Sequence, residues 1–217
     1  MPLPRAVLGL SLLTAASALL AASSYDRWDD KGCQGTPVLT KRTRSLVQCG
    51  AACLSRGGEC KVFFTQRTEG GVLCELFGAI HSCTVVLGVH MYSTAAAIRA
   101  AFGYVDVGNG QYYKFVTGGG NAWQESVTEC DQIFGSLFIP ESYEEFQVVR
   151  DYMELHSLGG SLWIGLRHDV NYPVDIHGIE AHDRDNVNSC ATMLIAYVHI
   201  HYEDCGASFD GKICKFV

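Results

Sequence analysis

The stretch "SLWIGLRHD", Ser161 to Asp169, is a short and almost wholly apolar run. A glycine pair precedes it and a polar segment follows it, so turn signals bound it on both sides. Apolar runs of this length between turn signals are typical of strands buried in a core. We therefore predict a core strand here, and the flanking residues decide which fold it belongs to.

A hairpin and two helices are predicted before this strand. In "YVDVGNGQYYKFV", two alternating stretches flank Asn109-Gly110, which is the strongest short-range hairpin signal. "TGGGN", 117–121, is expected to turn from this hairpin into a helix. Apolar residues at helical spacing then mark two amphipathic helices. Their stripes are Trp123, Val127, Cys130 and Phe134 in the first, and Phe146, Val149 and Met153 in the second.

Two further segments are predicted as closing strands, namely "CATMLIAYVHIHYEDC", Cys190 to Cys205, and "GKICKFV", 211–217. The stretch before the first of them, "IEAHDRDNVNSC", is rich in acids, amides and histidine. Such a composition fits either a solvated surface loop or an oxygen-rich binding site.

The motifs of this part of the chain come in a fixed order: Trp123-x2-Ser126-x3-Cys130, Gly135-x-Leu137, the "WIGL" strand, and then Cys190, Cys205 and Cys214. In this order they resemble the C-type lectin-like domain, from about Tyr104 to Val217. The resemblance implies an α+β fold of the short form, with two helices, mixed antiparallel strands and a long loop. It also implies the disulfides Cys130–Cys214 and Cys190–Cys205.

An earlier part of the chain has its own pattern. Leu46, Cys49, Cys53 and Leu54 recur at helical spacing, and "RGG" ends that predicted helix. "CKVFF" and "VLCELF" are predicted as two strands with a Gly-Gly turn between them. From the residues alone, six cysteines allow fifteen pairings.

The spacing Cys-x3-Cys-x6-Cys, followed by these two strands, resembles the PAN/apple domain over residues 28–92. The resemblance implies a helix on an antiparallel sheet and the bridges Cys33–Cys83, Cys49–Cys74 and Cys53–Cys60. Members of that family bind proteins or carbohydrates, and no residue here singles out a ligand.

The cysteine count and the first residues both indicate secretion. All ten cysteines follow residue 24, and an even number of this density predicts disulfides formed outside the cytosol. "AVLGLSLLTAASALLAA" is an apolar run that ends in small residues, so residues 1–23 are predicted to be a signal peptide rather than an anchor. No later segment has the roughly 20 apolar residues that a membrane span needs.

The predicted organisation is therefore α+β with two small disulfide-stabilised domains. A signal peptide covers 1–23, the PAN/apple-like domain 28–92, an Ala-rich helical linker 93–103, and the C-type lectin-like domain 104–217. The net charge of −7 argues against a nucleic-acid partner, because phosphate binding favours a basic surface.

Sugar-binding members of the C-type lectin-like family hold calcium with a Glu-Pro-Asn triplet and a Trp-Asn-Asp triplet at fixed distances before the last two loop cysteines. The matching positions here are Glu180-Ala181-His182 and Ile200-His201-Tyr202. Only Glu180 keeps a ligand of the family type, so the standard calcium-bridged sugar site is not expected. No cofactor is expected to be required, and a displaced calcium site among the nearby acids remains an alternative.

The candidate ligand-binding residues are the polar and aromatic side chains of this region: Glu180, His182, Asp183, Asp185, Asn186, Tyr202, Glu203 and Asp204. Tyr172 or Tyr202 is expected to provide an aromatic platform for a sugar. Alternation puts His199 and His201 on one strand face, which leaves a zinc or copper site as a weaker alternative. The identity of any metal stays unknown.

Catalytic residues are not predicted. Each cysteine has an implied partner, and neither a Gly-x-Ser-x-Gly nor a His-Glu-x-x-His motif occurs. The sequence thus favours a secreted, extracellular and non-enzymatic carbohydrate-recognition protein. The alternative is a calcium-independent protein-binding module, so the expected partner is a glycan or an extracellular protein.

Overall fold

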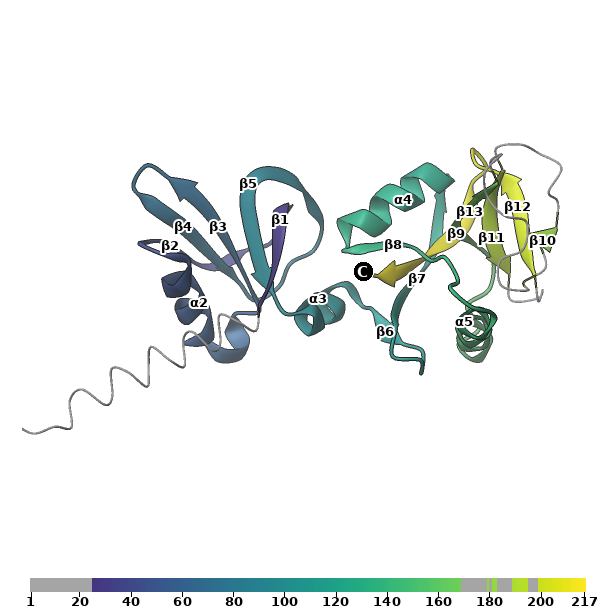
Figure 1. The fold of residues 1–217 in the computed structure, drawn as a ribbon, viewed down its shortest axis with the longest axis horizontal. Coiled ribbons are helices and arrows are strands. Elements are labelled where there is room, and N and C mark those ends of the chain that lie inside the picture. Colours follow the sequence, from purple (N-terminus) through teal and green to yellow (C-terminus); the bar gives the residue numbers. More distant parts are fainter. Residues whose placement is uncertain (1–24, 169–178, 180, 183–188, 195–198) are drawn as a thin grey trace, which may run out of the picture. The chain divides into compact units, whose positions relative to one another are not determined.

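The computed structural model describes residues 25–168, 179, 181–182, 189–194 and 199–217. The chain divides into two compact units, Met1–Ala101 and Phe102–Val217, each with its own sheet (Figure 1). The predicted signal peptide lies outside the described residues. Within the described ranges, no helix has the length and apolar character that crossing a membrane requires.

The first unit is an antiparallel sheet with a helix packed on it. Its strands stand in the order β1-β5-β3-β4-β2. The elements are β1 Asp26–Cys33, β2 Pro37–Thr43, α2 Leu46–Leu54, the 3-10 turn η1 Gly57–Glu59, β3 Val62–Thr68, β4 Gly71–Phe77 and β5 Cys83–Ser93. The predicted helix and the two predicted strands are confirmed.

Helix α2 begins after Ser45, whose hydroxyl oxygen accepts a hydrogen bond from the Gln48 N–H at 3.4 Å. It buries the face that carries Cys49 and Cys53, which lie one turn apart. Gly57 has φ of 55°, a left-handed conformation that suits glycine after a helix end. The sequence signal that ended this helix was therefore correct.

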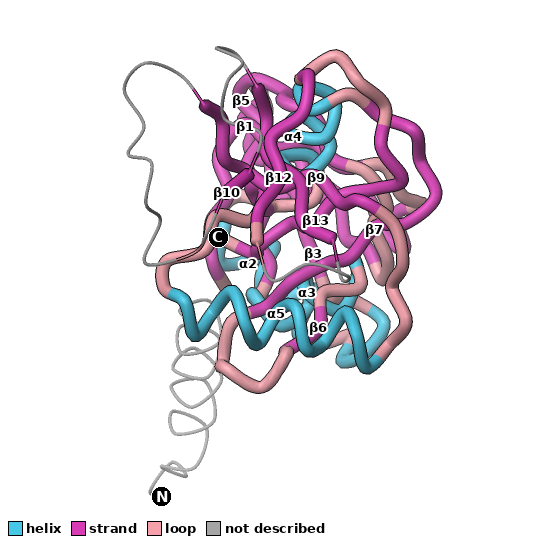
Figure 2. Tube along the Cα trace, turned by 90° about the vertical axis from the view of Figure 1, so that its right-hand side faces the viewer, coloured by secondary structure: helices cyan, strands magenta, loops and turns pink. Residues whose placement is uncertain are grey.

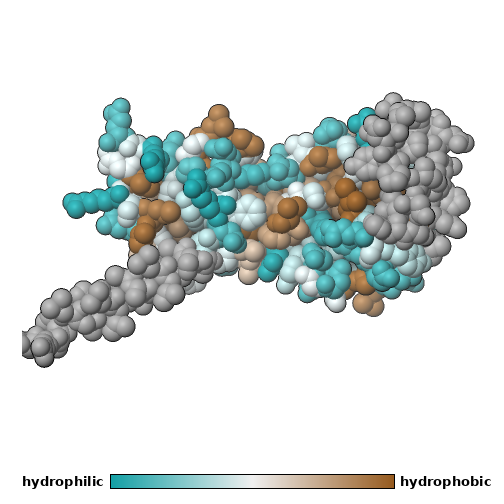
Figure 3. All heavy atoms as spheres, in the orientation of Figure 1, coloured by the Kyte–Doolittle hydropathy of each residue, from teal (hydrophilic) through white to brown (hydrophobic). Residues whose placement is uncertain are grey.

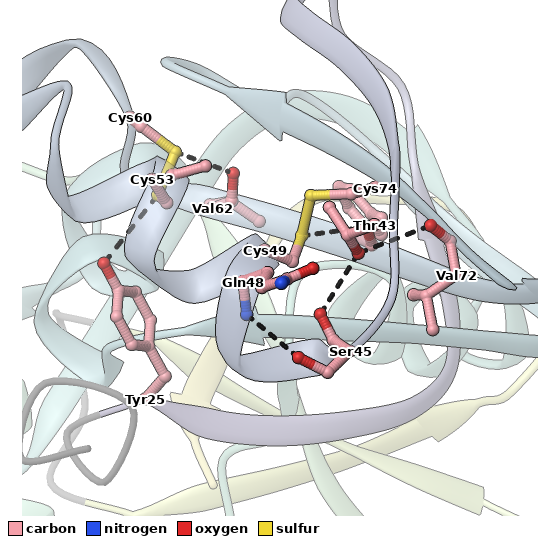
Figure 4. The surroundings of a disulfide bond; sticks show 12 residues. Tyr25, Thr43, Ser45, Gln48, Cys49, Cys53, Cys60, Val62, Val72 and Cys74 are labelled. Carbon is pink, nitrogen blue, oxygen red and sulfur yellow. Dashed lines mark hydrogen bonds between the residues drawn. A yellow bond between two sulfur atoms is a disulfide. The ribbon is translucent and has the colours of Figure 1, made fainter. Parts of the chain in front are cut away.

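Three disulfides cross-link the first unit. Cys49–Cys74 joins α2 to β4, and Cys53–Cys60 joins the end of α2 to the residues before β3 (Figure 4). Cys33–Cys83 joins β1 to β5. These are the three pairs that the PAN/apple resemblance implies.

The core of this unit also includes residues before the predicted start at 28. Phe63 stacks on Tyr92 with ring centroids 4.9 Å apart, and Tyr25 meets Phe63 edge-on at 5.2 Å. Tyr25 therefore packs in this core although it lies before the boundary predicted at residue 28.

The segment predicted as a linker, 93–103, is mostly helical. Helix α3 spans Ala95–Phe102, and the Thr94 hydroxyl accepts a hydrogen bond from the Ala97 N–H at 3.1 Å. The division between the two units falls in the last turn of α3.

The second unit combines one sheet with two helices. Its strand order is β10-β12-β11-β9-β13-β7-β6, and β8 pairs with β13. The elements are β6 Val105–Asp106, β7 Tyr112–Asn121, α4 Trp123–Gln132, β8 Gly135–Leu137, α5 Tyr143–Leu155, β9 Ser161–His168, β10 Ala181–His182, β11 Ser189–Leu194, β12 Ile200–Asp204 and β13 Phe209–Phe216. Both predicted helices and the core strand β9 are confirmed. Cys130–Cys214 and Cys190–Cys205 are paired, as the C-type lectin-like resemblance implies.

The apolar core of this unit lies between α5 and one face of the sheet, and α5 runs along that side in both views (Figures 1 and 2). The predicted stripe of α5, Phe146, Val149 and Met153, is fully buried there. On the other face of β9, Trp163 is also fully buried, and its indole N–H donates to the Asn121 carbonyl at 2.8 Å.

The structure corrects one turn prediction in this unit and confirms another. The "TGGGN" stretch continues β7 and pairs with β13, from Thr117↔Gly211 to Asn121↔Phe209, instead of turning. The predicted hairpin is confirmed: β6 pairs with β7 in antiparallel fashion, and the five residues that close it, 107–111, include Asn109-Gly110. This loop is held by the Asp106 carboxylate, which accepts from the N–H groups of Gly108 and Gly110 at 2.8 and 3.2 Å.

A buried carboxylate also links α5 to β7 and β13. Glu145 accepts hydrogen bonds from the Tyr113 hydroxyl, from Lys215 Nζ at 2.8 Å and from the Glu141 N–H at 2.7 Å. Burial favours the neutral form of Glu145, but these hydrogen bonds outweigh burial and lower its pKa. The carboxylate is therefore a satisfied structural group of the fold.

Candidate functional site

The most unusual connection in the second unit joins two strands that lie side by side. The end of β9 and the start of β11 are antiparallel neighbours, with His168 opposite Ser189. The chain between them, 169–188, is 20 residues long, whereas hairpin loops usually have about two to five residues. Long connections of this kind are typical of binding loops.

The described residues of this connection touch the sheet. Ile179 is 2% exposed and belongs to the core of the second unit. Strand β10 pairs in parallel with β12, with Ala181 opposite Ile200 and His182 opposite His201. The sheet edge at β12 is therefore covered by a strand from the connection itself.

A disulfide fixes the end to which the connection returns. Cys190–Cys205 joins the start of β11 to the residue after β12, and Cys190 is fully buried. The Cys205 carbonyl also accepts a hydrogen bond from the Trp123 N–H at 3.2 Å, which ties this corner to the start of α4. The site therefore rests on a rigid support.

Strand alternation sorts the side chains of β11 and β12 onto two faces. Glu203 lies opposite Cys190, and His201 lies opposite Thr192, so these four share one face. The other face carries Tyr202 and its apolar neighbours, which belong to the core. Glu203 and His201 thus point away from the core of the second unit.

Tyr202 does not have the role predicted for it. Its side chain is only 7% exposed and packs in the apolar core. A ring buried in this way cannot offer an open face to a sugar, so the aromatic-platform prediction is wrong for Tyr202. The physical reason is alternation, because Tyr202 lies between His201 and Glu203 and must face the opposite side.

Glu203 and Asp204, the two predicted ligand-binding acids at the end of β12, do not share one environment with Tyr202. Glu203 is half-buried on the face of Cys190. Asp204 is exposed, and its carboxylate accepts a hydrogen bond from the Gly206 N–H at 2.8 Å, which closes the turn after β12. Asp204 therefore has a turn-stabilising contact in addition to any contact with a ligand.

Most of the other predicted residues lie outside the described part of the chain. These are Glu180, Asp183, Asp185 and Asn186, together with Tyr172. For His182 the structure describes the backbone position in β10 and its register with β12. The contribution of these side chains to ligand binding stays a prediction.

The histidine pair lies as the alternation predicted. The rings of His199 and His201 have centroids 4.5 Å apart. Among the residues that the structure describes, no group of three or more His, Cys, Asp or Glu side chains gathers as a metal site would require. In the described region, the zinc or copper alternative therefore has two candidate ligands, His199 and His201.

The sequence interpretation missed two residues beside this region. Thr192 is fully buried between His201 and Trp163, and within the described ranges its hydroxyl has no hydrogen-bond partner. Arg167 is exposed and lies in register with Cys190, which in turn is opposite Glu203. The pairing of β9 with β11 places them here, and neither has a motif that would reveal it.

Comparisons with known proteins gave matches among solved structures alone: neither a family model nor a curated protein matches the chain. The structure titled "SPL-1 - GlcNAc complex" has a TM-score of 0.43 and 23% identity, over 52% of this chain and 91% of that one. The cow C-type carbohydrate-recognition domain of CD23, solved with a GlcNAc2Man3 oligosaccharide, has a TM-score of 0.39 and 23% identity, over 49% and 88%. Human lithostathine has a TM-score of 0.43 and 17% identity, over 52% and 88%.

Proposed function

We propose that this chain is a secreted, non-enzymatic recognition protein whose second unit is a C-type lectin-like domain that binds carbohydrate. In this proposal the ligand contacts the connection 169–188 and the adjoining end of β12. The first unit is a PAN/apple-like module. The family's calcium-bridged sugar site is absent, and binding relies on direct hydrogen bonds.

The observation that carries this proposal is the long polar connection between the neighbouring strands β9 and β11. Its return is anchored by the Cys190–Cys205 disulfide, so the sheet presents a polar segment on a rigid frame. Binding residues are concentrated on loops that a rigid scaffold positions. The apolar core and the hydrogen-bonded Glu145 carboxylate of this unit serve as its structural support.

The side chains available in this region suit a polyhydroxylated ligand. Carboxylates accept hydrogen bonds, while amides and imidazoles both donate and accept, and sugar hydroxyls need both kinds of partner. Glu203 and His201 extend from the face of β12 that points away from the core. Calcium is not part of the proposal, because only Glu180 remains of the residues that ligate calcium in the family's two triplets.

A glycan array tests this function directly. The oxidised protein is applied in calcium, in chelator, and in chelator with added zinc, and we expect glycan binding that chelator does not remove. The double substitution Asp183→Asn with Asp185→Asn should weaken that binding by about tenfold or more, since hydrogen bonds to charged groups are lost. The matched control is Asp151→Asn with Glu154→Gln, two exposed acids on α5.

The rival function is calcium-independent protein binding through the same surface. The missing calcium ligands favour it, because protein recognition needs no metal to orient hydroxyl groups. Absence of glycan binding in all three conditions, combined with capture of a protein partner by the second unit, would support the rival. Binding that requires calcium would contradict the metal-free part of our proposal.

A further inference from the structure

The first unit has a hollow of about 530 Å³ beside the start of helix α2. Its wall combines residues from the strands β1, β3, β4 and β5 with the residues at the start of α2. The charged or titratable members of this wall are Arg27, Arg44, Arg67 and His90. All of its lining residues are described, and none of them is acidic.

Two of these arginines have no acidic partner among the residues that the structure describes. Arg44 and Arg67 are exposed, and neither forms an ion pair with any residue in the described ranges. Helix α2, whose positive end lies at the same place, carries no acid in its first turn. The cationic groups at this end of the hollow are therefore open to an anion.

The third arginine is held by an acid next to the hollow. Arg27 Nε lies 2.5 Å from Asp29 Oδ1, and His90 Nδ1 lies 2.7 Å from the same oxygen. The hydrogen bond from Arg27 lowers the pKa of Asp29. This cluster fixes the positions of Arg27 and His90, and the Asp29 carboxylate offsets the charge of Arg27.

The charge of the chain is divided between the units. Residues 25–101 contain nine Lys and Arg against six Asp and Glu, whereas residues 102–217 contain six against seventeen. An arginine-lined hollow therefore lies in a positive unit of an acidic protein. Hydrophilic side chains project from this unit in the space-filling view (Figure 3).

The same wall carries hydroxyl groups. Ser45, Thr65 and Thr68 line the hollow together with the arginines, and its volume falls in the range of about 300–1,000 Å³ typical of small-ligand sites. A second hollow, also about 530 Å³, lies along α2 and is lined by Lys41, Arg42 and Arg56 among others. Hydroxyls with arginines suit a ligand that carries both hydroxyl and anionic groups.

We infer that the hollow beside α2 binds an oxyanion, sulfate or carboxylate, carried by an acidic glycan. Arg44 and Arg67 donate charge-assisted hydrogen bonds to the oxyanion, and the hydroxyls of Ser45 and Thr68 contact the sugar ring. The second hollow extends the cationic surface for a longer chain. This site is separate from the loop surface of the second unit and goes beyond the function proposed for it.

The test uses the full oxidised chain and three probes: a sulfated glycosaminoglycan hexasaccharide, a sialic-acid oligomer and an oligoglutamate. The double substitution Arg44→Gln with Arg67→Gln should weaken binding of the acidic glycan by at least about tenfold. The control, Lys61→Gln with Arg99→Gln, removes the same charge elsewhere in the first unit and should change affinity less than about twofold.

Binding of the hexasaccharide alone identifies sulfate as the anion, and binding of the sialic-acid oligomer alone identifies carboxylate. Hydrogen exchange on the unsubstituted protein gives a second readout, since ligand should protect the amides of 44–46 and 65–68. The inference is overturned if neither glycan binds at low salt, if oligoglutamate binds as tightly as the glycans, or if the control loses as much affinity. Loss of neutral-glycan binding through the second unit would leave these outcomes unchanged, so the two proposals fail separately.

Discussion

Among the described residues, fourteen apolar or cysteine side chains are buried in the first unit, five of them half-cystines, whereas twenty-two are buried in the second unit, three of them half-cystines. The first unit has three disulfides and the second has two. Small domains with little apolar area to bury depend on cross-links, and larger cores depend on burial. We therefore expect loss of a disulfide to destabilise mainly the first unit, and loss of a buried apolar side chain to destabilise mainly the second unit.

The largest difference should come from removing a cross-link of the first unit. Replacing Cys49 and Cys74 by alanine opens a loop of 25 residues, which lowers the free energy of unfolding by about 3–4 kcal/mol. We expect the first unit to lose its amide protection against hydrogen exchange while the second unit keeps its own. Equal loss in both units would show that they do not differ as their cores suggest.

A cavity in the core of the second unit should destabilise that unit and leave the stability of the first unit unchanged. Met153 is fully buried on α5, so Met153→Ala should lower the free energy of unfolding of the second unit by about 2–5 kcal/mol. Hydrogen exchange resolved by unit is again the measurement. Glu154→Ala, an exposed neighbour on the same helix, is the control and should have little effect.

The buried carboxylate of Glu145 makes the stability of the second unit depend on pH. The folded-state pKa of Glu145 is lowered, so its stabilisation is present above the unfolded pKa of about 4.3 and is lost as the pH falls through the lower folded value. Glu145→Gln should cost about 1.5–3 kcal/mol at pH 7, as hydrogen bonds to a charged group are lost. Urea unfolding between pH 7 and pH 3 should show a smaller pH dependence for this variant than for Glu154→Gln.

The smallest stability effect is expected at the exposed acid of the first unit. Asp29→Asn removes an ion pair at the surface, so the melting temperature should change by less than about 2 °C. The same change frees Arg27 and His90, and affinity for the acidic glycan should rise by about two- to fivefold. A loss of affinity, measured by titration at low salt, would mean that Asp29 is needed to hold Arg27 in place.

Periodicity predicted most of the helices and strands. The four-residue spacing of Cys49 and Cys53 and the stripe of α5 both correspond to buried helix faces, because burial imposes the helical repeat on the sequence. The core strand β9 was evident because both of its faces are covered over residues 162–166, and this part of the strand is therefore apolar.

The glycine-rich segment shows where local signals fail. A run of three glycines normally indicates a turn, yet 117–121 is part of a strand because β13 pairs with it at both ends, Thr117 and Asn121. A Cβ on Gly211 would clash with the Val116 carbonyl oxygen, so the close approach of these strands requires glycine on β13. Pairing partners far apart in the sequence cannot be read from either segment alone.

The candidate site was predictable in part. Alternation correctly put His199 and His201 together, and applied one residue further it would have assigned Tyr202 to the core and Glu203 to the opposite face. Arg167 and Thr192 could not be found this way, because they join the site through the pairing of β9 with β11. The arginine-lined hollow needed the structure for the same reason, since its residues come from four strands and a helix start.

The Cys130–Cys214 bridge has a practical consequence for handling the protein. The two cysteines stand on opposite sides of the connection 169–188 in the sequence. A protease that cuts once within this connection would leave two polypeptides still joined by that bridge, with Cys190–Cys205 intact in the C-terminal piece. A nicked preparation would migrate as a single species on a non-reducing gel, and reductant would release two fragments. Purity judged without reductant would therefore count cleaved molecules as whole ones.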